Sequence, residues 1–318
     1  MTQSDFLAPR EANHQPLTPL GWLARAATTH PDRVAVISGD ERISYRDFHA
    51  RARRLCSALG AHGVRRGDVV ATLLLNTPAQ LEAHFGVPMS GAVLNTLNTR
   101  LDAAGIAFIL GHGAARVLIV DSELAPLARE ALALAAVRPL VVEYADPTAG
   151  VPAALGATDY EAFVAGGDPA FDWAMPDDEW DTISLNYTSG TTGDPKGVLY
   201  HHRGAALLAM GNVIHAQMPP GAVYLWTLPM FHCNGWCFPW TLSIVAGTHV
   251  CLRQVRAGAM YDAIADHGVT HLCGAPIVMS TLLNAKDDER RAFPQRVSFF
   301  TAAAPPPESV LAGMDAAG

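Results

Sequence analysis

One stretch of the chain concentrates residues that suit the binding of a polyphosphate. Between Thr188 and Gly197 lie four hydroxyl side chains, three glycines and one lysine, in the order TSGTTGDPKG. Glycines let the backbone approach a ligand closely, hydroxyl and N–H groups donate hydrogen bonds to its oxygens, and Lys196 supplies a compact cation. An ordinary polar turn requires far fewer such residues. The stretch therefore predicts a phosphate-binding loop.

The residues on either side predict that this loop connects two strands. Apolar residues alternate from Ile183 to Tyr187 before it, and Val198 and Tyr200 continue the alternation after it. A Walker A loop is excluded, because Gly190 is not followed four residues later by Gly-Lys-Ser/Thr. A Walker loop opens directly into a helix, whereas a strand follows here, so we expect a movable flap.

This loop closely resembles the phosphate loop of the adenylate-forming superfamily, which contains the acyl-CoA synthetases. The resemblance implies that Thr188 and Lys196 are catalytic. It also assigns the binding of ATP and AMP to the loop residues Thr188, Ser189, Gly190, Thr191, Thr192, Gly193 and Lys196.

A second stretch, LPMFHCNGW from Leu228 to Trp236, strengthens the resemblance. In these ligases the matching segment follows a strand and begins the acyl pocket, and a histidine or aromatic residue lies near the carboxylate being activated. His232 occupies that position, although a lone histidine is more often a core residue. The implied catalytic residue is His232, and the implied substrate pocket contains His232, Asn234, Gly235 and Trp236.

Weaker matches extend the resemblance over almost the whole chain. The stretch FTAAAP, residues 300–305, resembles the small-residue segment that packs against adenine, which implies contacts from Ala303, Ala304 and Pro305. Ser44-Tyr45, residues 65–68 and residues 91–100 also match. Together with FHCNGWC, the last of these is most similar to the branch that activates short-chain, medium-chain and some aromatic carboxylic acids.

The resemblance implies a reaction in two steps. A carboxylate attacks the α-phosphate of ATP to give acyl-AMP and pyrophosphate, and coenzyme A then displaces AMP. Mg²⁺ and Lys196 would neutralise the leaving pyrophosphate. The implied small molecules are therefore ATP, Mg²⁺, coenzyme A and a carboxylic acid, whose identity the sequence leaves open; a homodimer is common in similar enzymes.

Several elements of the family pattern are missing from the sequence. These are a Tyr-Gly-x-Thr-Glu segment, the aspartate that holds the ribose, and a small C-terminal domain with a catalytic lysine. We therefore expect the N-terminal portion of an acyl-CoA synthetase, with little or no ligase activity alone. The site residues include no metal ligand. Two alternatives stay open: a non-catalytic nucleotide-binding or acyl-binding fragment, and an NTP-hydrolysing or kinase-like enzyme.

Composition narrows the class of protein. The 318 residues carry 22 Lys+Arg against 30 Asp+Glu, a net charge of −8, which argues against a nucleic-acid-binding protein. Half of the residues are hydrophobic and 16% are charged, so disorder is not expected. Five cysteines, an odd number, indicate a reducing compartment, and Cys233 and Cys237 have no second pair with which to hold zinc. Without an apolar leader or an ~18-residue apolar run, we expect a cytoplasmic protein with no integral membrane segment.

Apolar periodicity predicts an α/β fold of two packed α/β subdomains, with largely parallel sheets flanked by helices. We expect a first subdomain over 1–145, a Pro/Gly-rich connection over 146–180, and a second subdomain over 181–318. Strands are expected near 34–37, 69–75, 91–95, 116–120, 182–188, 223–227, 248–252, 270–273 and 296–301. Helices are expected near 22–30, 45–59, 78–90, 102–111, 122–135, 204–217, 258–267, 276–285 and from 308.

Overall fold

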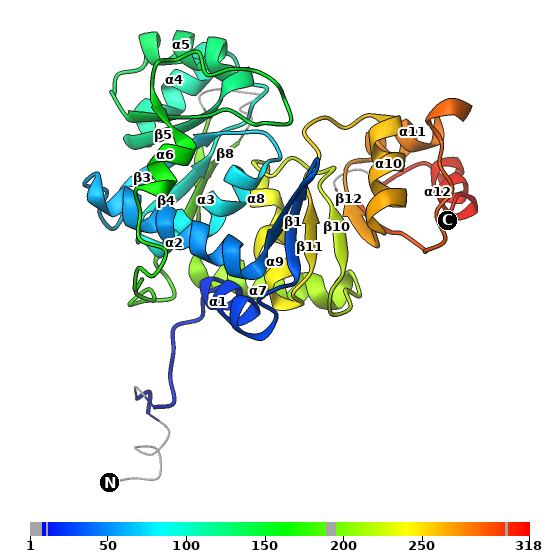
Figure 1. The fold of residues 1–318 in the computed structure, drawn as a ribbon, viewed down its shortest axis with the longest axis horizontal. Coiled ribbons are helices and arrows are strands. Elements are labelled where there is room, and N and C mark those ends of the chain that lie inside the picture. Colours follow the sequence, from blue (N-terminus) through cyan, green and yellow to red (C-terminus); the bar gives the residue numbers. More distant parts are fainter. Residues whose placement is uncertain (1–7, 11, 189–194, 303–304) are drawn as a thin grey trace.

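The computed structural model describes residues 8–10, 12–188, 195–302 and 305–318, and these form two sheets that lie side by side (Figure 1). The large sheet has the order β7 (Thr158–Asp159), β6 (Leu140–Tyr144), β5 (Ala115–Asp121), β3 (Val69–Leu73), β4 (Val93–Thr96), β8 (Thr182–Tyr187), β9 (Gly197–His201). The small sheet has the order β13 (Ser298–Phe300), β12 (His271–Cys273), β10 (Val223–Leu225), β11 (Thr248–Val250), β1 (Val34–Ser38), β2 (Glu41–Ser44).

Both sheets are largely parallel, as expected. Within the described part of the chain, β2 and β9 run antiparallel to their neighbours, and each lies at the edge of its sheet. Parallel strands need crossover connections, and helices supply them. The helices are α1 (Leu20–Thr29), α2 (Tyr45–Ala61), α3 (Pro78–Met89), α4 (Ala103–His112), α5 (Ala125–Leu134), α6 (Tyr160–Ala165), α7 (His202–His215), α8 (Cys233–Trp236), α9 (Phe238–Ile244), α10 (Ala257–His267), α11 (Pro276–Leu283) and α12 (Glu308–Ala316), with 3₁₀ turns η2 (Ser122–Leu124) and η3 (Asp287–Glu289).

Helices occupy the space between the sheets as well as their outer faces. Residues of α1, α2, α3, α7 and α9 share one core with β1, β10 and β8. Every residue of α3 is buried, because the large sheet covers one of its sides and this shared core covers the other. On the outer faces, α4 and α5 pack against the large sheet, and α10 and α11 pack against the small sheet (Figure 1).

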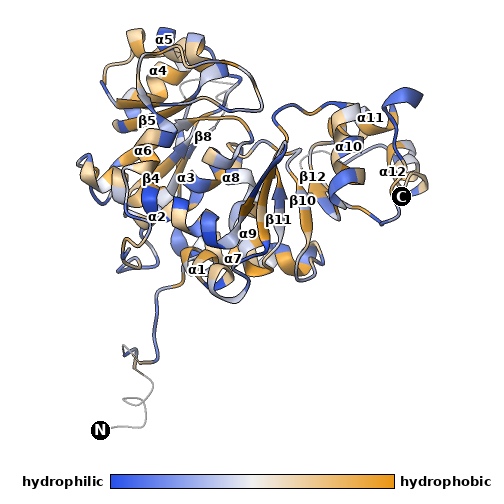
Figure 2. Cartoon of the chain, viewed as in Figure 1, coloured by the Kyte–Doolittle hydropathy of each residue, from blue (hydrophilic) through white to orange (hydrophobic). Residues whose placement is uncertain are grey.

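The pattern of hydropathy follows this layering. Strands β3, β5 and β10 are almost entirely buried and apolar, which explains why their sequences lack alternation (Figure 2). Local signals fix several helix starts: Ser44 accepts a hydrogen bond from the Asp47 N–H at the start of α2, and Asp102 accepts one from the Gly105 N–H at the start of α4. Each expected helix and strand is found, with ends shifted by a few residues.

The division of the chain between the sheets differs from the expected boundary. Strands β8 and β9, from the expected second subdomain, pair with the large sheet, whereas β1 and β2, from the expected first, pair with the small sheet. The expected connection over 146–180 contains β7 and α6, and β6 lies just before it. The boundary was predicted from the order of elements along the chain. Strand pairing depends instead on which strands lie next to each other in space, so each sheet contains strands from both expected subdomains.

Candidate active site

The predicted phosphate loop lies at the end of a two-stranded hairpin at the edge of the large sheet. Strand β8 pairs with β9 through Tyr187 and Gly197, so the sequence prediction of two flanking strands is confirmed. Thr188 closes the base of the loop: its N–H donates to the Lys196 carbonyl (3.0 Å), and its hydroxyl accepts from the Lys196 N–H (3.2 Å). Both residues are exposed. Ser189, Gly190, Thr191, Thr192 and Gly193 lie outside the described residues.

The predicted acyl segment adopts an unusual backbone conformation. Five consecutive residues, from Cys233 to Cys237, have φ between 47° and 63°, so α8 is a single left-handed turn. Each such residue other than glycine costs about 1–2 kcal/mol. At Gly235 a side chain is also excluded by space, because a Cβ there would lie 2.7 Å from Cζ3 of Trp226. The segment therefore stores strain that other contacts must offset.

Side chains from the large sheet hold this left-handed turn in place. The Asn234 side chain is fully buried, and its Oδ1 accepts hydrogen bonds from Ser184 Oγ (2.9 Å) and Asn186 Nδ2 (2.6 Å), both on β8. On the other side, Asn212 of α7 donates to the Trp236 carbonyl (2.8 Å). Because β8 also leads toward the predicted phosphate loop, the described base of that loop and the predicted acyl segment are attached to the same strand.

The residues just before the turn are fixed by the ends of β3 and β4. Asn76 donates to the carbonyls of Trp226 (2.9 Å) and Leu228 (3.0 Å) and accepts from the Met230 N–H (2.8 Å). Thr96, the last residue of β4, donates to the Phe231 carbonyl (2.9 Å). The segment that follows β10 of the small sheet is thus anchored to the carboxyl ends of strands in the large sheet.

The strand order explains why ligand-binding chemistry belongs at this edge. From β3 the chain continues to β4 on one side, and from β5 it continues to β6 on the other, so the connections diverge between β3 and β5. In open α/β sheets, ligands bind outside the carboxyl ends of strands at such a point. Asn76 follows β3, and Asp121 ends β5. Both residues contact segments of the small sheet.

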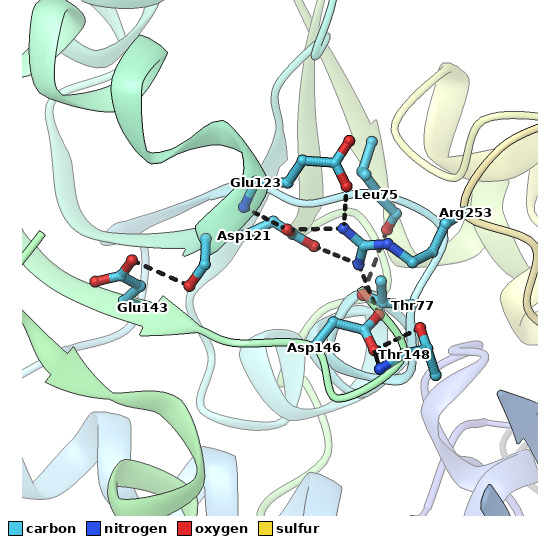
Figure 3. A network of polar contacts seen from close by, with 9 residues as sticks. Leu75, Thr77, Asp121, Glu123, Glu143, Asp146, Thr148 and Arg253 are labelled. Carbon is cyan, nitrogen blue, oxygen red and sulfur yellow. Dashed lines mark hydrogen bonds and ion pairs between the residues drawn. The ribbon is translucent and has the colours of Figure 1, made fainter. Parts of the chain in front are cut away.

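Arg253 makes the second link between the sheets (Figure 3). It follows β11 and reaches Asp121 (2.8 and 3.0 Å), Asp146 (2.6 Å) and Glu123 (2.7 Å), which lie at or just after the ends of β5 and β6. Asp121 and Asp146 are each 1% exposed. Within this network, Asp121 also accepts from the Glu123 N–H, and Asp146 accepts from the N–H and hydroxyl of Thr148. The network holds the two sheets at a fixed spacing beside the site.

His232 is exposed at the start of the turn, beside a thiol. Its Nε2 lies 3.9 Å from Cys233 Sγ, and this hydrogen bond raises the pKa of His232 above its usual value, although partial burial opposes the shift. Trp236 is half-buried and meets Phe300, the last residue of β13, edge to face at 6.2 Å. An apolar wall therefore lies next to the histidine.

The predicted adenine segment directly follows β13 of the small sheet, the strand that ends at Phe300. Pro305 is exposed, while Ala303 and Ala304 lie outside the described residues. The hydroxyl of Thr301 is buried and has no hydrogen-bond partner within the described structure. A cavity of about 640 Å³ lies elsewhere, near the amino ends of β3 and β4, and no predicted site residue lines it.

Sequence reasoning missed the residues that position the acyl segment. These are short polar side chains within or just after buried apolar strands, where each needs a partner: Asn76, Thr96, Ser184 and Asn186. Their signal was present, since an amide or hydroxyl inside an apolar run is costly unless it is hydrogen-bonded. No sequence signal identified their partner, because the 226–236 segment is separated from these residues by many positions in the sequence.

The described residues offer no metal site of their own. In these parts of the chain, no three His, Cys, Asp or Glu side chains gather closely enough to hold a metal ion. Over the same residues, no helix combines the length and the apolar character needed to cross a membrane.

Comparison with known proteins agrees with the geometry. The family model described as AMP-binding enzyme matches residues 23–318. The chain is 48% identical to a peroxisomal acetate/butyrate–CoA ligase of Arabidopsis thaliana and 41% identical to a peroxisomal trans-cinnamate:CoA ligase of Petunia hybrida, in each case over 99% of this chain and 58% of the relative. It thus spans little more than half the length of these curated relatives.

Solved structures share the fold. The N-terminal domain of FACL13 from Mycobacterium tuberculosis superposes with a TM-score of 0.81 at 26% identity, covering 94% of this chain and 73% of that one. An anthranilate CoA ligase in complex with anthranoyl-AMP superposes with a TM-score of 0.84 at 23% identity, covering 97% of this chain and 60% of that one. With a family match over nearly the whole sequence, the chain belongs to the AMP-binding enzyme family.

Proposed function

We propose that this chain forms the ATP-binding and acid-binding part of an AMP-forming acyl-CoA ligase. One observation carries the proposal: β8 leads into the phosphate loop at its end, and two of its side chains hold the Asn234 turn of the acyl segment. A loop suited to polyphosphate and a segment suited to a carboxylic acid are therefore fixed to the same strand. The reaction requires these two anionic reactants to be held together.

In this proposal, each part of the site has a distinct task. Thr188, Ser189, Gly190, Thr191, Thr192, Gly193 and Lys196 bind the phosphates, and Lys196 offsets the charge of the leaving pyrophosphate. His232 lies beside the carboxylate, and Trp236 with Phe300 forms an apolar wall for the rest of the acid. Ala303, Ala304 and Pro305 lie against adenine. Magnesium would come with the ATP phosphates, and no protein ligand for it is proposed.

The acid is proposed to be short or medium in chain length, or aromatic. The relatives' names support this range, since one is an acetate/butyrate–CoA ligase and another is a trans-cinnamate:CoA ligase. Cytoplasmic location and a homodimer remain proposals, and the peroxisomal relatives favour testing the location first.

The chain offers a matched test of Lys196, because its sequence contains two lysines, Lys196 and Lys286, and both are exposed. ATP binding is measured by calorimetry for the parent chain, Lys196→Ala and Lys286→Ala. Loss of a charge-assisted hydrogen bond of about 1.5–3 kcal/mol predicts an affinity roughly 10- to 150-fold lower in Lys196→Ala alone. Equal affinity in all three proteins would contradict the assignment of Lys196.

The acid is tested separately with hydrolysis-resistant acyl-sulfamoyl adenosines that carry acetyl, butyryl or cinnamoyl groups. Binding of at least one of them, weakened in His232→Ala, is expected. Carboxylate-dependent exchange of pyrophosphate into ATP measures turnover in the same samples. If the chain binds neither ATP nor any of the analogues, the proposed function is wrong.

A further inference from the structure

The left-handed turn brings three groups that can hold or release a proton to one point. Cys233 opens the turn and is half-buried, with His232 Nε2 3.9 Å from its sulfur. Tyr200 of β9 also interacts electrostatically with the same thiol. The mechanism proposed above uses His232 but gives no task to Cys233 or Tyr200.

The other four cysteines have the opposite surroundings. Cys56, Cys237 and Cys273 are buried, and burial raises the pKa of each thiol to about 12. Cys251 is half-buried like Cys233, yet burial of its thiol and the nearby carboxylates, Asp146 foremost, raise its pKa well above the usual value. Cys251 is therefore a comparison thiol that is more deeply buried and has no imidazole partner.

We propose that Cys233 is a nucleophilic thiol and a covalent modification site for small carbon electrophiles, with His232 holding the thiol proton. In the step with a haloacetamide, the proton passes from Sγ to Nε2 of His232, and the sulfur then forms a bond to the methylene carbon. The carbon–halogen bond breaks, and halide leaves with the electron pair. The step needs no oxidant or metal.

The charges around the pair support the transfer. The hydrogen bond between the two side chains lowers the pKa of Cys233, although burial opposes this shift. The same hydrogen bond raises the pKa of His232. Tyr200 lowers the Cys233 pKa further from β9. The positive charge of Arg100, in the segment after β4, lowers the pKa of His232. The thiolate is the reactive form, so its fraction at neutral pH sets the rate.

A neighbouring buried amide adds a separate observation. Nδ2 of Asn234, next along the turn, is buried without a hydrogen-bond partner in the described structure, while Oδ1 of the same side chain has two. A buried donor with no partner is unusual, and it marks this turn as a place where an acceptor oxygen would be stabilised.

The test is a labelling rate measured for each cysteine. The native chain is treated with iodoacetamide over a range of pH, and peptide mass spectrometry follows all five thiols. Because each unit of pKa changes the thiolate fraction about tenfold, Cys233 is expected to react at least tenfold faster than Cys251 at pH 7. Cys233→Ser should remove the fast reaction, and Cys251→Ser should leave it intact.

A second set of variants separates proton transfer from simple exposure. His232→Gln keeps a polar side chain but removes the base, so the inflection of the Cys233 rate should move toward about pH 8.5, the value of a free thiol. His215→Gln, at the exposed end of α7, should leave the profile unchanged. Circular dichroism of each variant checks that the fold persists.

Two results would overturn the inference: Cys233 labelling no faster than Cys251, or a pH profile that His232→Gln does not move. Neither result depends on ATP or on an acid, so the failure of this inference is distinguishable from failure of the proposed function. If Cys233 reacts faster than Cys251 and His232→Gln moves its pH profile, an acyl-sulfamoyl adenosine bound in the acyl pocket should also protect Cys233 from labelling. This last measurement rests on the proposed function.

Discussion

Replacing Arg253 with methionine tests whether its charge holds the two sheets together. The guanidinium makes hydrogen bonds of 2.6 to 3.0 Å to Asp121, Asp146 and Glu123, and its side chain is 12% exposed. Methionine retains much of the side-chain volume but leaves Asp121 and Asp146, each 1% exposed, without a counter-charge. The variant therefore removes the charge while disturbing packing little.

The expected loss of unfolding free energy is about 3–5 kcal/mol, the cost of leaving buried charge uncompensated. If this charge is the cause, adding Asp121→Asn and Asp146→Asn to Arg253→Met should recover part of the loss, because no buried carboxylate then remains unpaired. Because the network lies beside the anchored acyl segment, Arg253→Met should also weaken binding of the acyl-sulfamoyl adenosines.

Urea unfolding followed by tryptophan fluorescence measures the change, with circular dichroism as a second probe. The matched control is Arg296→Met, which breaks an ion pair with Asp315 in which both side chains are about four-fifths exposed. Exposed pairs contribute little, so the control should unfold at nearly the same urea concentration as the parent chain. Equal losses in Arg253→Met and the control would refute the argument.

Three further predictions concern the core around the site. Burial lowers the pKa of His84 to about 4 and of His249 to about 3, so both stay neutral in the fold while the unfolded chain binds protons below about pH 6.5. The free energy of unfolding should therefore be constant with respect to these histidines above pH 6.5 and fall by about 1.4 kcal/mol per histidine for each pH unit between 6.5 and 4. Urea unfolding at several pH values measures this fall, and a flat profile would contradict it. Gly235→Ala should lower the melting temperature by several degrees, because its Cβ meets the Trp226 ring, whereas Gly60→Ala, in open space within α2, should not. Asn76→Ala should cost about 2–4 kcal/mol in urea unfolding, since it leaves three buried backbone groups of the 226–230 segment unpaired; a loss below 1 kcal/mol would argue against the clamp.

Much of the fold could be predicted from local patterns. The apolar runs of β3 and β5 and the helical spacing in α2 reflect burial that repeats with each element's own period, so their type can be found without knowledge of neighbours. The short elements β7 and α6 could not be found in this way. Strand β7 has two residues and α6 has six, too few to show a period.

The chemistry of the candidate site was also partly present in the sequence. The Thr188 to Gly197 stretch predicted a phosphate loop between strands because its residue types carry their binding chemistry locally, and the hairpin of β8 and β9 confirms the flanking strands. The roles of Lys196 and His232 remain proposals that ligand binding must test.

Local sequence patterns predicted a candidate phosphate-binding loop, the positions of most helices and strands, and largely parallel sheets. Tertiary packing, in contrast, places β1 and β2 in the small sheet, brings Asn76 and Asn186 against the predicted acyl segment, and lets Arg253 join the sheets. These two kinds of information differ in the distance along the chain over which they act. Periodicity and turn chemistry act within a few residues, whereas a buried amide or guanidinium selects its partner from whatever the packed sheets bring within hydrogen-bond distance.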